Sequence, residues 1–206
     1  MVGVRRGRPG PRRTLDEQTI LDAALTVLAE RGADGVSIRG IAARVGVAPN
    51  AIYTYFPDKA AVLHGLVEQL LGRVNHDRFI NPSLPWRDRI HALALDLRAE
   101  LLTHPGAVHL VIGTPLNGPN ALGVGQILLA ILADAGLDPD NATNAAYLLN
   151  VHILGSVAIQ VADLNHTQPP TRADPDIETQ RFLWGLNRIL DGLAAHVRTG
   201  ERPLPS

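Results

Sequence analysis

The sequence predicts an all-α protein of about nine helices. Apolar residues recur three and four positions apart along most of the chain, and glycine, proline and capping residues separate these segments. No segment alternates polar and apolar residues between hairpin turns, so we expect no strands. The chain has 206 residues and no cysteine, which excludes disulfides, thiol catalysis and cysteine-bound zinc.

Four helices are predicted in residues 14–76. The second and third are short and are joined by a turn that contains Gly46, which is the pattern of a helix-turn-helix. Pro49 falls in the first turn of the third helix, where proline is tolerated. The expected helices run from a Thr14 cap to Gly32, from a Ser37 cap to Gly46, from Ala48 to Phe56, and from Lys59 to about His76.

Five longer or more apolar helices are predicted after residue 85. They run from Trp86 to Thr103, from Ala107 to Ile112, from Asn120 to Ala135, from a cap at Asp138 or Asp140 to about Asp163, and from Ile177 to Val197. The expected organisation is a basic arm (1–13), a helix-turn-helix domain (14–60), a larger helical domain (61–198) and a tail (199–206).

Charge is unevenly distributed, although the formal net charge is only −1. Residues 1–59 hold nine basic and six acidic residues, whereas residues 60–206 hold ten basic and fourteen acidic ones. A basic N-terminal region followed by an acidic remainder of the chain indicates that the N-terminal region contacts a polyanion. Residues 1–13, rich in Arg, Pro and Gly, are expected to be flexible. They form either a disordered tail or an arm that lies on phosphates or in a minor groove.

The third helix carries polar residues at positions that its apolar side chains do not need for packing. A recognition helix presents such residues to base edges. Asn50 can hydrogen-bond a base edge, and Ala51 or Thr54 can meet a thymine methyl group. Tyr53 and Tyr55 can donate to phosphates. This short helix is therefore expected to read DNA.

Residues 15–63 resemble the DNA-binding domain of the tetracycline-repressor (TetR) family of bacterial transcription regulators. The likeness is carried by the ordered segment ILDAALTVLAERGADGVSIRGIAARVGVAPNAIYTYFPDKAAVL. It implies a phosphate contact for Lys59, the only lysine in the chain, and Ser37 and Arg39 are placed for the same task. The expected DNA-binding residues are Ser37, Arg39, Pro49, Asn50, Ala51, Tyr53, Thr54, Tyr55 and Lys59.

Residues 77–198 resemble the ligand-binding and dimerising domain of the same family, through LLTHPGAVHLVIGTPLNGPNA and RFLWGLNRILDGLAAH. The resemblance implies an effector and a homodimer formed by the last two long helices, about 141–163 and 177–197. The residues support the dimer independently, because these helices are apolar around much of their circumference. A deeply buried central helix in a monomer is the alternative. The apolar positions include Leu148, Val151, Ile153, Leu154, Val157, Ile159 and Val161.

A ligand pocket is expected among the fourth to eighth helices, which carry more apolar surface than one bundle face needs. Family members that hold a drug–magnesium complex use two histidines. Counted from Lys59, the first position is Asn75 here, and the second is His109 or Val111 depending on the alignment. We therefore expect an uncharged or weakly polar organic ligand bound without metal or cofactor. The expected ligand-binding residues are His64, Val67, Leu71, Leu97, His109, Ile112, Thr114 and Asn150, with Leu63, Leu93 and Leu128 as further walls and His152 as a further polar group.

Two functions fit these observations. The first is a ligand-responsive dimeric regulator, a repressor of a palindromic operator, with the effector either an inducer or a co-repressor. The alternative is an all-α module that binds small molecules or proteins without DNA activity. The basic arm and the residues from Ser37 to Lys59 favour the first. No catalytic arrangement indicates an enzyme. Apolar runs such as 127–133 and 153–162 are shorter than the ~20 residues of a membrane span, so a cytoplasmic protein with no membrane partner is expected.

Overall fold

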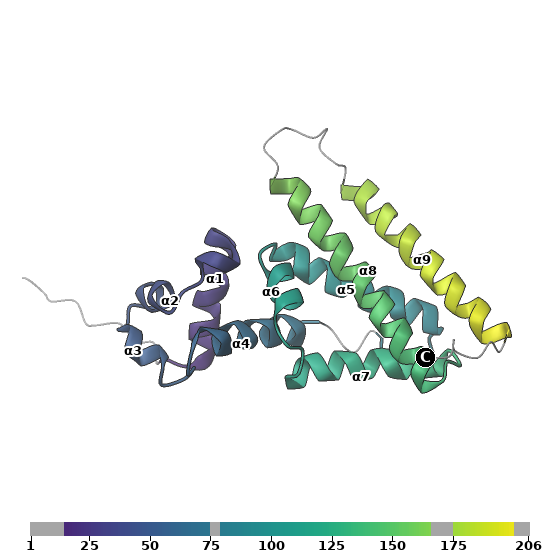
Figure 1. The fold of residues 1–206 in the computed structure, drawn as a ribbon, viewed down its shortest axis with the longest axis horizontal. Coiled ribbons are helices and arrows are strands. Elements are labelled where there is room, and N and C mark those ends of the chain that lie inside the picture. Colours follow the sequence, from purple (N-terminus) through teal and green to yellow (C-terminus); the bar gives the residue numbers. More distant parts are fainter. Residues whose placement is uncertain (1–14, 75–78, 166–174, 200–206) are drawn as a thin grey trace, which may run out of the picture.

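The computed structural model describes residues 15–74, 79–165 and 175–199, and those residues form nine helices and no strand (Figure 1). The predicted all-α class is confirmed. The arm at 1–13 and most of the tail lie outside the described residues. The helices are α1 (Glu17–Gly35), α2 (Ile38–Val45), α3 (Pro49–Ile52), α4 (Lys59–Gly72), α5 (Trp86–Thr103), α6 (Ala107–Gly113), α7 (Pro119–Asp134), α8 (Pro139–Asn165) and α9 (Pro175–Thr199).

Helices α1–α3 form a small head, residues 15–56, and α5–α9 form a larger body (Figure 1). Helix α4 packs against α1 on the head and against α5, α6 and α7 of the body. One apolar core runs from Ile20 in α1 through Leu66 in α4 to Val157 in α8, and all three side chains are fully buried. A displacement of α4 therefore shifts its packing partners in both the head and the body, because close-packed interiors transmit strain.

The body has a second core between α5, α7, α8 and α9. Leu93, Ile131, Leu149 and Leu186 lie at its centre. Helices α8 and α9 run side by side along one flank (Figure 1). Gly185 permits this close approach, because a Cβ there would come within 2.5 Å of the His152 ring.

Three predicted helix boundaries are wrong. Asp16, not Thr14, caps α1, and its Oδ1 accepts a hydrogen bond from the Thr19 amide at 2.7 Å. The predicted end at Gly32 is only a kink, and the helix resumes to Gly35. Helix α4 ends at Gly72 rather than near His76, because the chain must turn there to bury Val74 in the body core.

The expectation that no segment is apolar enough to span a membrane is also wrong. One helix among the described residues is long and apolar enough to do so, judged by length and composition alone. Residues 139–162 of α8 pass that test, and 28 % of their apolar window is buried within the chain. A single such helix is weak support for a membrane span, because core helices of soluble proteins pass the same test. In this fold α8 packs against α5, α6, α7 and α9.

Candidate DNA-reading head and ligand cavity

The angle between α2 and α3 is set by caps. The Ser37 hydroxyl oxygen accepts a hydrogen bond from the Gly40 amide at 3.1 Å and starts α2. Gly46 ends it in the left-handed conformation, with φ 82°, which glycine adopts at little cost. Arg44 donates to both carboxylate oxygens of Glu30, at 2.7 and 2.8 Å, and ties α2 to α1. The head therefore presents α3 at a fixed orientation.

Helix α3 buries one residue and exposes its neighbours. Ile52 is fully buried, whereas Pro49, Asn50 and Thr54 are exposed and Tyr53 is 51 % exposed. Ala51 is half-buried. The helix itself spans only four residues and continues as a turn, so it is shorter than predicted. Its exposed polar side chains are brought together on the surface of the head.

Tyr55 has a different role from the predicted phosphate contact. It is half-buried, and its hydroxyl donates to the Leu15 carbonyl oxygen at 2.6 Å. Position 55 follows Ile52 by three residues and so shares its inward side. The hydrogen bond ties the end of the α3 segment to the start of α1.

Two exposed cations flank α3. Arg39 lies in the first turn of α2, and Lys59 lies in the first turn of α4, which Asp58 caps by accepting from the Ala61 amide at 2.8 Å. Neither cation forms an ion pair within the described ranges. Both can therefore meet an external anion such as a DNA phosphate.

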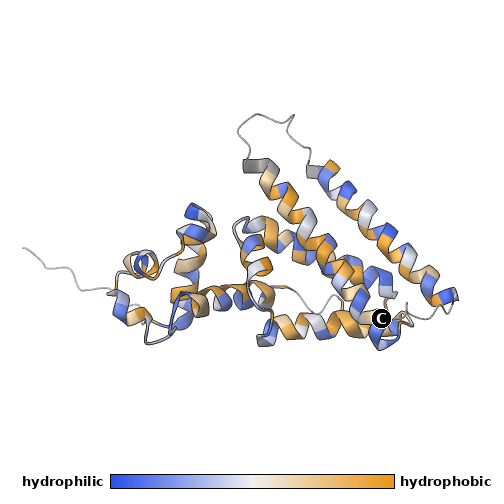
Figure 2. Cartoon of the chain, in the orientation of Figure 1, coloured by the Kyte–Doolittle hydropathy of each residue, from blue (hydrophilic) through white to orange (hydrophobic). Residues whose placement is uncertain are grey.

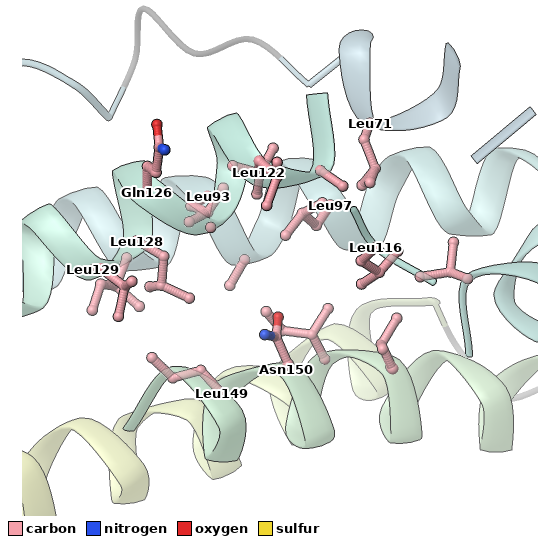
Figure 3. A pocket seen from close by; sticks show the side chains of 18 of the residues that line it. Leu71, Leu93, Leu97, Leu116, Leu122, Gln126, Leu128, Leu129, Leu149 and Asn150 are labelled. Atoms are coloured by element: carbon pink, nitrogen blue, oxygen red, sulfur yellow. The ribbon is translucent and has the colours of Figure 1, made fainter. Parts of the chain in front are cut away.

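The body contains an apolar cavity of about 310 Å³ between α4, α5, α6, α7 and α8 (Figure 3). Among the described residues that line it, only Gln126 and Asn150 have polar side chains. The Asn150 amide points from α8 into the space between the helices (Figure 3). Half-exposed leucines at 116, 122 and 129 mark the mouth. The cavity suits an organic molecule with few polar groups.

The structure brings only part of the predicted ligand set to this cavity. Leu71, Leu97 and Asn150 line it, as do the expected walls Leu93 and Leu128. Sequence reasoning missed the residues other than Leu128 that α7 and the loop before it contribute, although a lone glutamine in an apolar helix was a usable signal. The residues predicted to line the pocket but lying outside its lining are His64, Val67, His109, Ile112 and Thr114, together with Leu63 and His152.

These misplacements have local causes. Helix α6 turns Leu110 and Val111 inward, which leaves His109 exposed and Ile112 57 % exposed. His64 shares a 2.9 Å hydrogen bond with the Asn117 side chain. Val67 is buried in the core that α4 shares with the head. Apolar periodicity shows that a helix is buried on one side, but not which neighbour covers that side.

Helix α4 is joined to the cavity wall by Glu68. Its two carboxylate oxygens accept from the amides of Asn120 at 2.7 Å and Ala121 at 3.1 Å, and so cap the start of α7. Asn120 also donates from its side chain to the Glu68 carbonyl at 2.9 Å. A side chain at Gly118 would collide with Glu68. Helix α7, which lines the cavity, is therefore fastened to the helix that starts at Lys59.

No metal cluster is found in the described parts of the chain, where no three His, Asp or Glu side chains come together as ligands. His109 is exposed, and Asn75 lies outside the described residues.

A helix-turn-helix with an outward-facing polar helix, fastened by α4 to a helical body with an apolar cavity, defines a DNA-binding regulator with separate reading and sensing parts. Comparison with known proteins gives the family. The model for bacterial regulatory proteins of the tetR family matches residues 20–66, and that for the tetracyclin repressor-like C-terminal domain matches residues 81–178. The chain belongs to the tetR family of transcriptional regulators. The predicted family and function class are confirmed.

Individual relatives agree with this assignment. The chain is 31 % identical to the tetracycline repressor protein class A from transposon 1721 of Escherichia coli, over 92 % of this chain and 96 % of the relative. It is also 31 % identical to an HTH-type transcriptional regulator of Saccharopolyspora erythraea, over 93 % of this chain and 73 % of the relative. The crystal structure of a TetR variant from Acinetobacter baumannii AYE in complex with minocycline superposes with a TM-score of 0.78 at 26 % identity, covering 93 % of this chain and 100 % of that one.

Proposed function

We propose that this chain is a homodimeric repressor that binds a palindromic DNA duplex through two heads and releases it when a small organic molecule fills the body cavity. The observation that carries this function is the course of α4, which starts at Lys59, caps α7 through Glu68 and lines the cavity with Leu71. Catalysis has no part in it, because the relatives are named as regulators and repressors. Its place of action is the cytoplasm, where bacterial DNA is found.

The head supplies base and phosphate contacts. Asn50, Ala51 and Thr54 meet base edges, because they lie along the outer side of the α3 segment. Tyr53, at 51 % exposure, and the flanking cations donate to phosphates. Ser37 and Pro49 contribute backbone and cap geometry at the two helix starts. The arm at 1–13 adds positive charge on the same polyanion.

The dimer forms through α8 and α9. Helix α8 carries hydrophobic stretches, drawn in orange (Figure 2), and several of its apolar side chains remain exposed in the single chain. A second copy would bury them in a four-helix interface. Two-fold symmetry then places the two heads on half-sites about one helical turn, ~34–36 Å, apart. The uncovered side chains are Tyr147, Leu148, Val151, Ile159, Ile177 and Trp184.

The effector is uncharged, because none of the described residues that line the cavity has a charged side chain to pair with an ion. Asn150 and Gln126 supply one or two hydrogen bonds. The similar A. baumannii protein holds minocycline, which supports a body that takes organic molecules of this size class. Metal plays no part in this proposal.

The test has two steps. Light scattering of the full chain at micromolar concentration should give a dimer, and selection from random duplexes should give a palindromic site; a monomer would contradict the proposal. The uncharged dye N-phenyl-1-naphthylamine is then titrated with and without that duplex. Linkage requires the duplex to change dye affinity by the same factor as the dye changes duplex affinity. Equal dye affinities in both titrations would rule out release through this cavity.

A further inference from the structure

A second, polar cavity of about 140 Å³ lies on the other side of α5 and α8 from the apolar one. Neighbouring residues divide between the two cavities, since successive residues of a helix point 100° apart. Leu97 lines the apolar cavity and Arg98 the polar one, and Ile153 and His152 divide in the same way. The polar cavity, hereafter the Arg98 cavity, is lined by Arg98, His152, Ser156, Ile159, Gln160, Glu178, Arg181 and Phe182.

Two arginines of the body are buried among the described residues, and only one of them forms an ion pair there. Arg89 is 4 % exposed and donates to the Asp134 carboxylate at 2.6 Å. Arg98 is 7 % exposed and donates from Nη2 to the neutral Gln160 side chain at 2.8 Å, while its Nε has no partner. No carboxylate of the described chain forms an ion pair with it. A buried cation without a counter-ion is costly.

The surroundings of Arg98 reflect this cost. Burial lowers the pKa of the Arg98 guanidinium, and the negative charge of Glu178 partly opposes the shift. The Glu178 carboxylate is itself engaged by Arg181 at 2.7 Å. The charges of Glu178 and Arg181 offset one another. Arg98 therefore leaves about one net positive charge on the cavity lining.

Phe182 forms the aromatic wall of the cavity and contacts both Arg98 and His152. The Arg98 guanidinium lies 5.3 Å from the Phe182 ring centroid. The His152 ring stacks on the same phenyl ring, at 5.1 Å and 15° between planes. The His152 Nε2 pairs with the Phe182 carbonyl oxygen at 3.0 Å, which assigns the proton to that nitrogen. A cation held over an aromatic ring forms a pocket with a charged end and an apolar side.

We propose that the Arg98 cavity binds a small monocarboxylate, whose oxygens pair with the Arg98 guanidinium and whose apolar end lies against Phe182. A carboxylate matches the planar fork of a guanidinium. The volume corresponds to roughly four or five water molecules at about 30 Å³ each, which admits a short-chain acid. A single net positive charge favours a monoanion over doubly charged phosphate. This site does not depend on the proposed operator or on the apolar effector.

Propionate is the probe, titrated into the full chain against sodium chloride at equal ionic strength. We expect a saturable rise in melting temperature and a heat of binding with propionate, and neither with inorganic phosphate. Arg98→Met should abolish the propionate response. Arg188→Gln, on the outer side of α9 and absent from the lining, should keep it. A response to propionate that survives in Arg98→Met, no saturable response in the wild type, or equal saturable binding of phosphate would overturn the proposal.

Glu178→Gln keeps the test decisive if Arg98→Met fails to fold. Removing the wall carboxylate deletes a negative charge and leaves Arg181 unpaired, so propionate affinity should rise about tenfold. Unchanged or weaker propionate binding in Glu178→Gln would contradict the charge arrangement on which the site depends.

Discussion

The head and the body build their functional surfaces in opposite ways. The head turns the side chains proposed to read DNA, at positions such as 50 and 54, outward from one short segment, and side-chain caps fix the helices on either side of that segment. The body turns its working surface inward and assembles it from five helices spread over residues 71–154. A rigid presented surface suits the recognition of DNA, which has a fixed shape. A cavity between helices suits an effector that acts by changing the spacing of those helices on binding.

Helix α4 packs against both the head and the body, so truncating its central buried side chain should have the largest effect on stability. Leu66 is fully buried in the core that the head and body share. Leu66→Ala should lower the free energy of unfolding by about 3 kcal/mol through lost burial and a residual cavity. Urea unfolding at fixed protein concentration measures this, and one cooperative transition is expected because the core is continuous.

Ile112→Ala is the matched control, because this side chain is 57 % exposed and lies outside the cavity lining. It should change the free energy of unfolding by no more than about 0.5 kcal/mol. Two separate transitions in Leu66→Ala would show that the head folds independently of the body.

The next effect separates two kinds of contact within the head. Asn50→Ala should lose about 1–3 kcal/mol of discrimination at particular base pairs. Lys59→Ala should instead weaken binding to all duplexes alike and reduce the slope of log affinity against log salt by about one. Binding assays on the selected and a scrambled duplex at several salt concentrations measure both. A change of sequence preference in Lys59→Ala with an intact slope would reverse the assigned roles.

The contrast between the two regions also explains what the sequence could predict. The exposed positions of Asn50 and Lys59 were predictable because caps, the Gly46 turn and a short helix are local signals, whereas their contacts with DNA stay a prediction. Tyr55 was the exception, since its partner Leu15 lies forty residues away. The cavity lining depends on which helices meet. A leucine at 93 and an isoleucine at 112 look alike in a helical pattern, and only tertiary packing places one inside and the other on the surface.

Filling the cavity should weaken dye binding in the body and leave duplex binding by the head unchanged. Gly125 lines the cavity, and a Cβ there would meet no atom within 4 Å. Gly125→Leu should therefore weaken N-phenyl-1-naphthylamine binding at least tenfold, or about 1.4 kcal/mol, while duplex binding without dye stays unchanged. Gly123→Leu, on the same helix with equal room but outside the lining, is the control and should bind the dye normally.

Two neighbouring tyrosines allow a smaller test within the head. Tyr55→Phe removes the hydroxyl that donates to Leu15 and should cost about 1 kcal/mol of stability. Tyr53→Phe should leave stability unchanged and weaken duplex binding, because the Tyr53 side chain is 51 % exposed. Thermal unfolding and duplex titration of both variants check the pair. If Tyr53→Phe were the less stable of the two, the assignment of inner and outer tyrosine would be wrong.

The smallest effect compares one exposed cap in each region. The pKa of Asp16 is lowered by hydrogen bonds from the Thr19 side chain and amide. The pKa of Asp138 is lowered by bonds from the Asn141 amide and side chain. A carboxylate whose pKa is lower in the folded state stabilises above its unfolded pKa, about 3.9, and that contribution is lost as pH falls through the lowered folded value. Acid should therefore loosen the first turns of α1 and α8.

Asparagine caps helices as well but does not titrate. Asp16→Asn should remove the acid-induced loss of hydrogen-exchange protection at the start of α1 and leave that at the start of α8, and Asp138→Asn should do the reverse. Protection factors at pH 6 and pH 3, each corrected for the intrinsic exchange rate, measure the difference. Loss of the acid response at both helix starts in either variant would mean that the head and body respond to these caps as one unit.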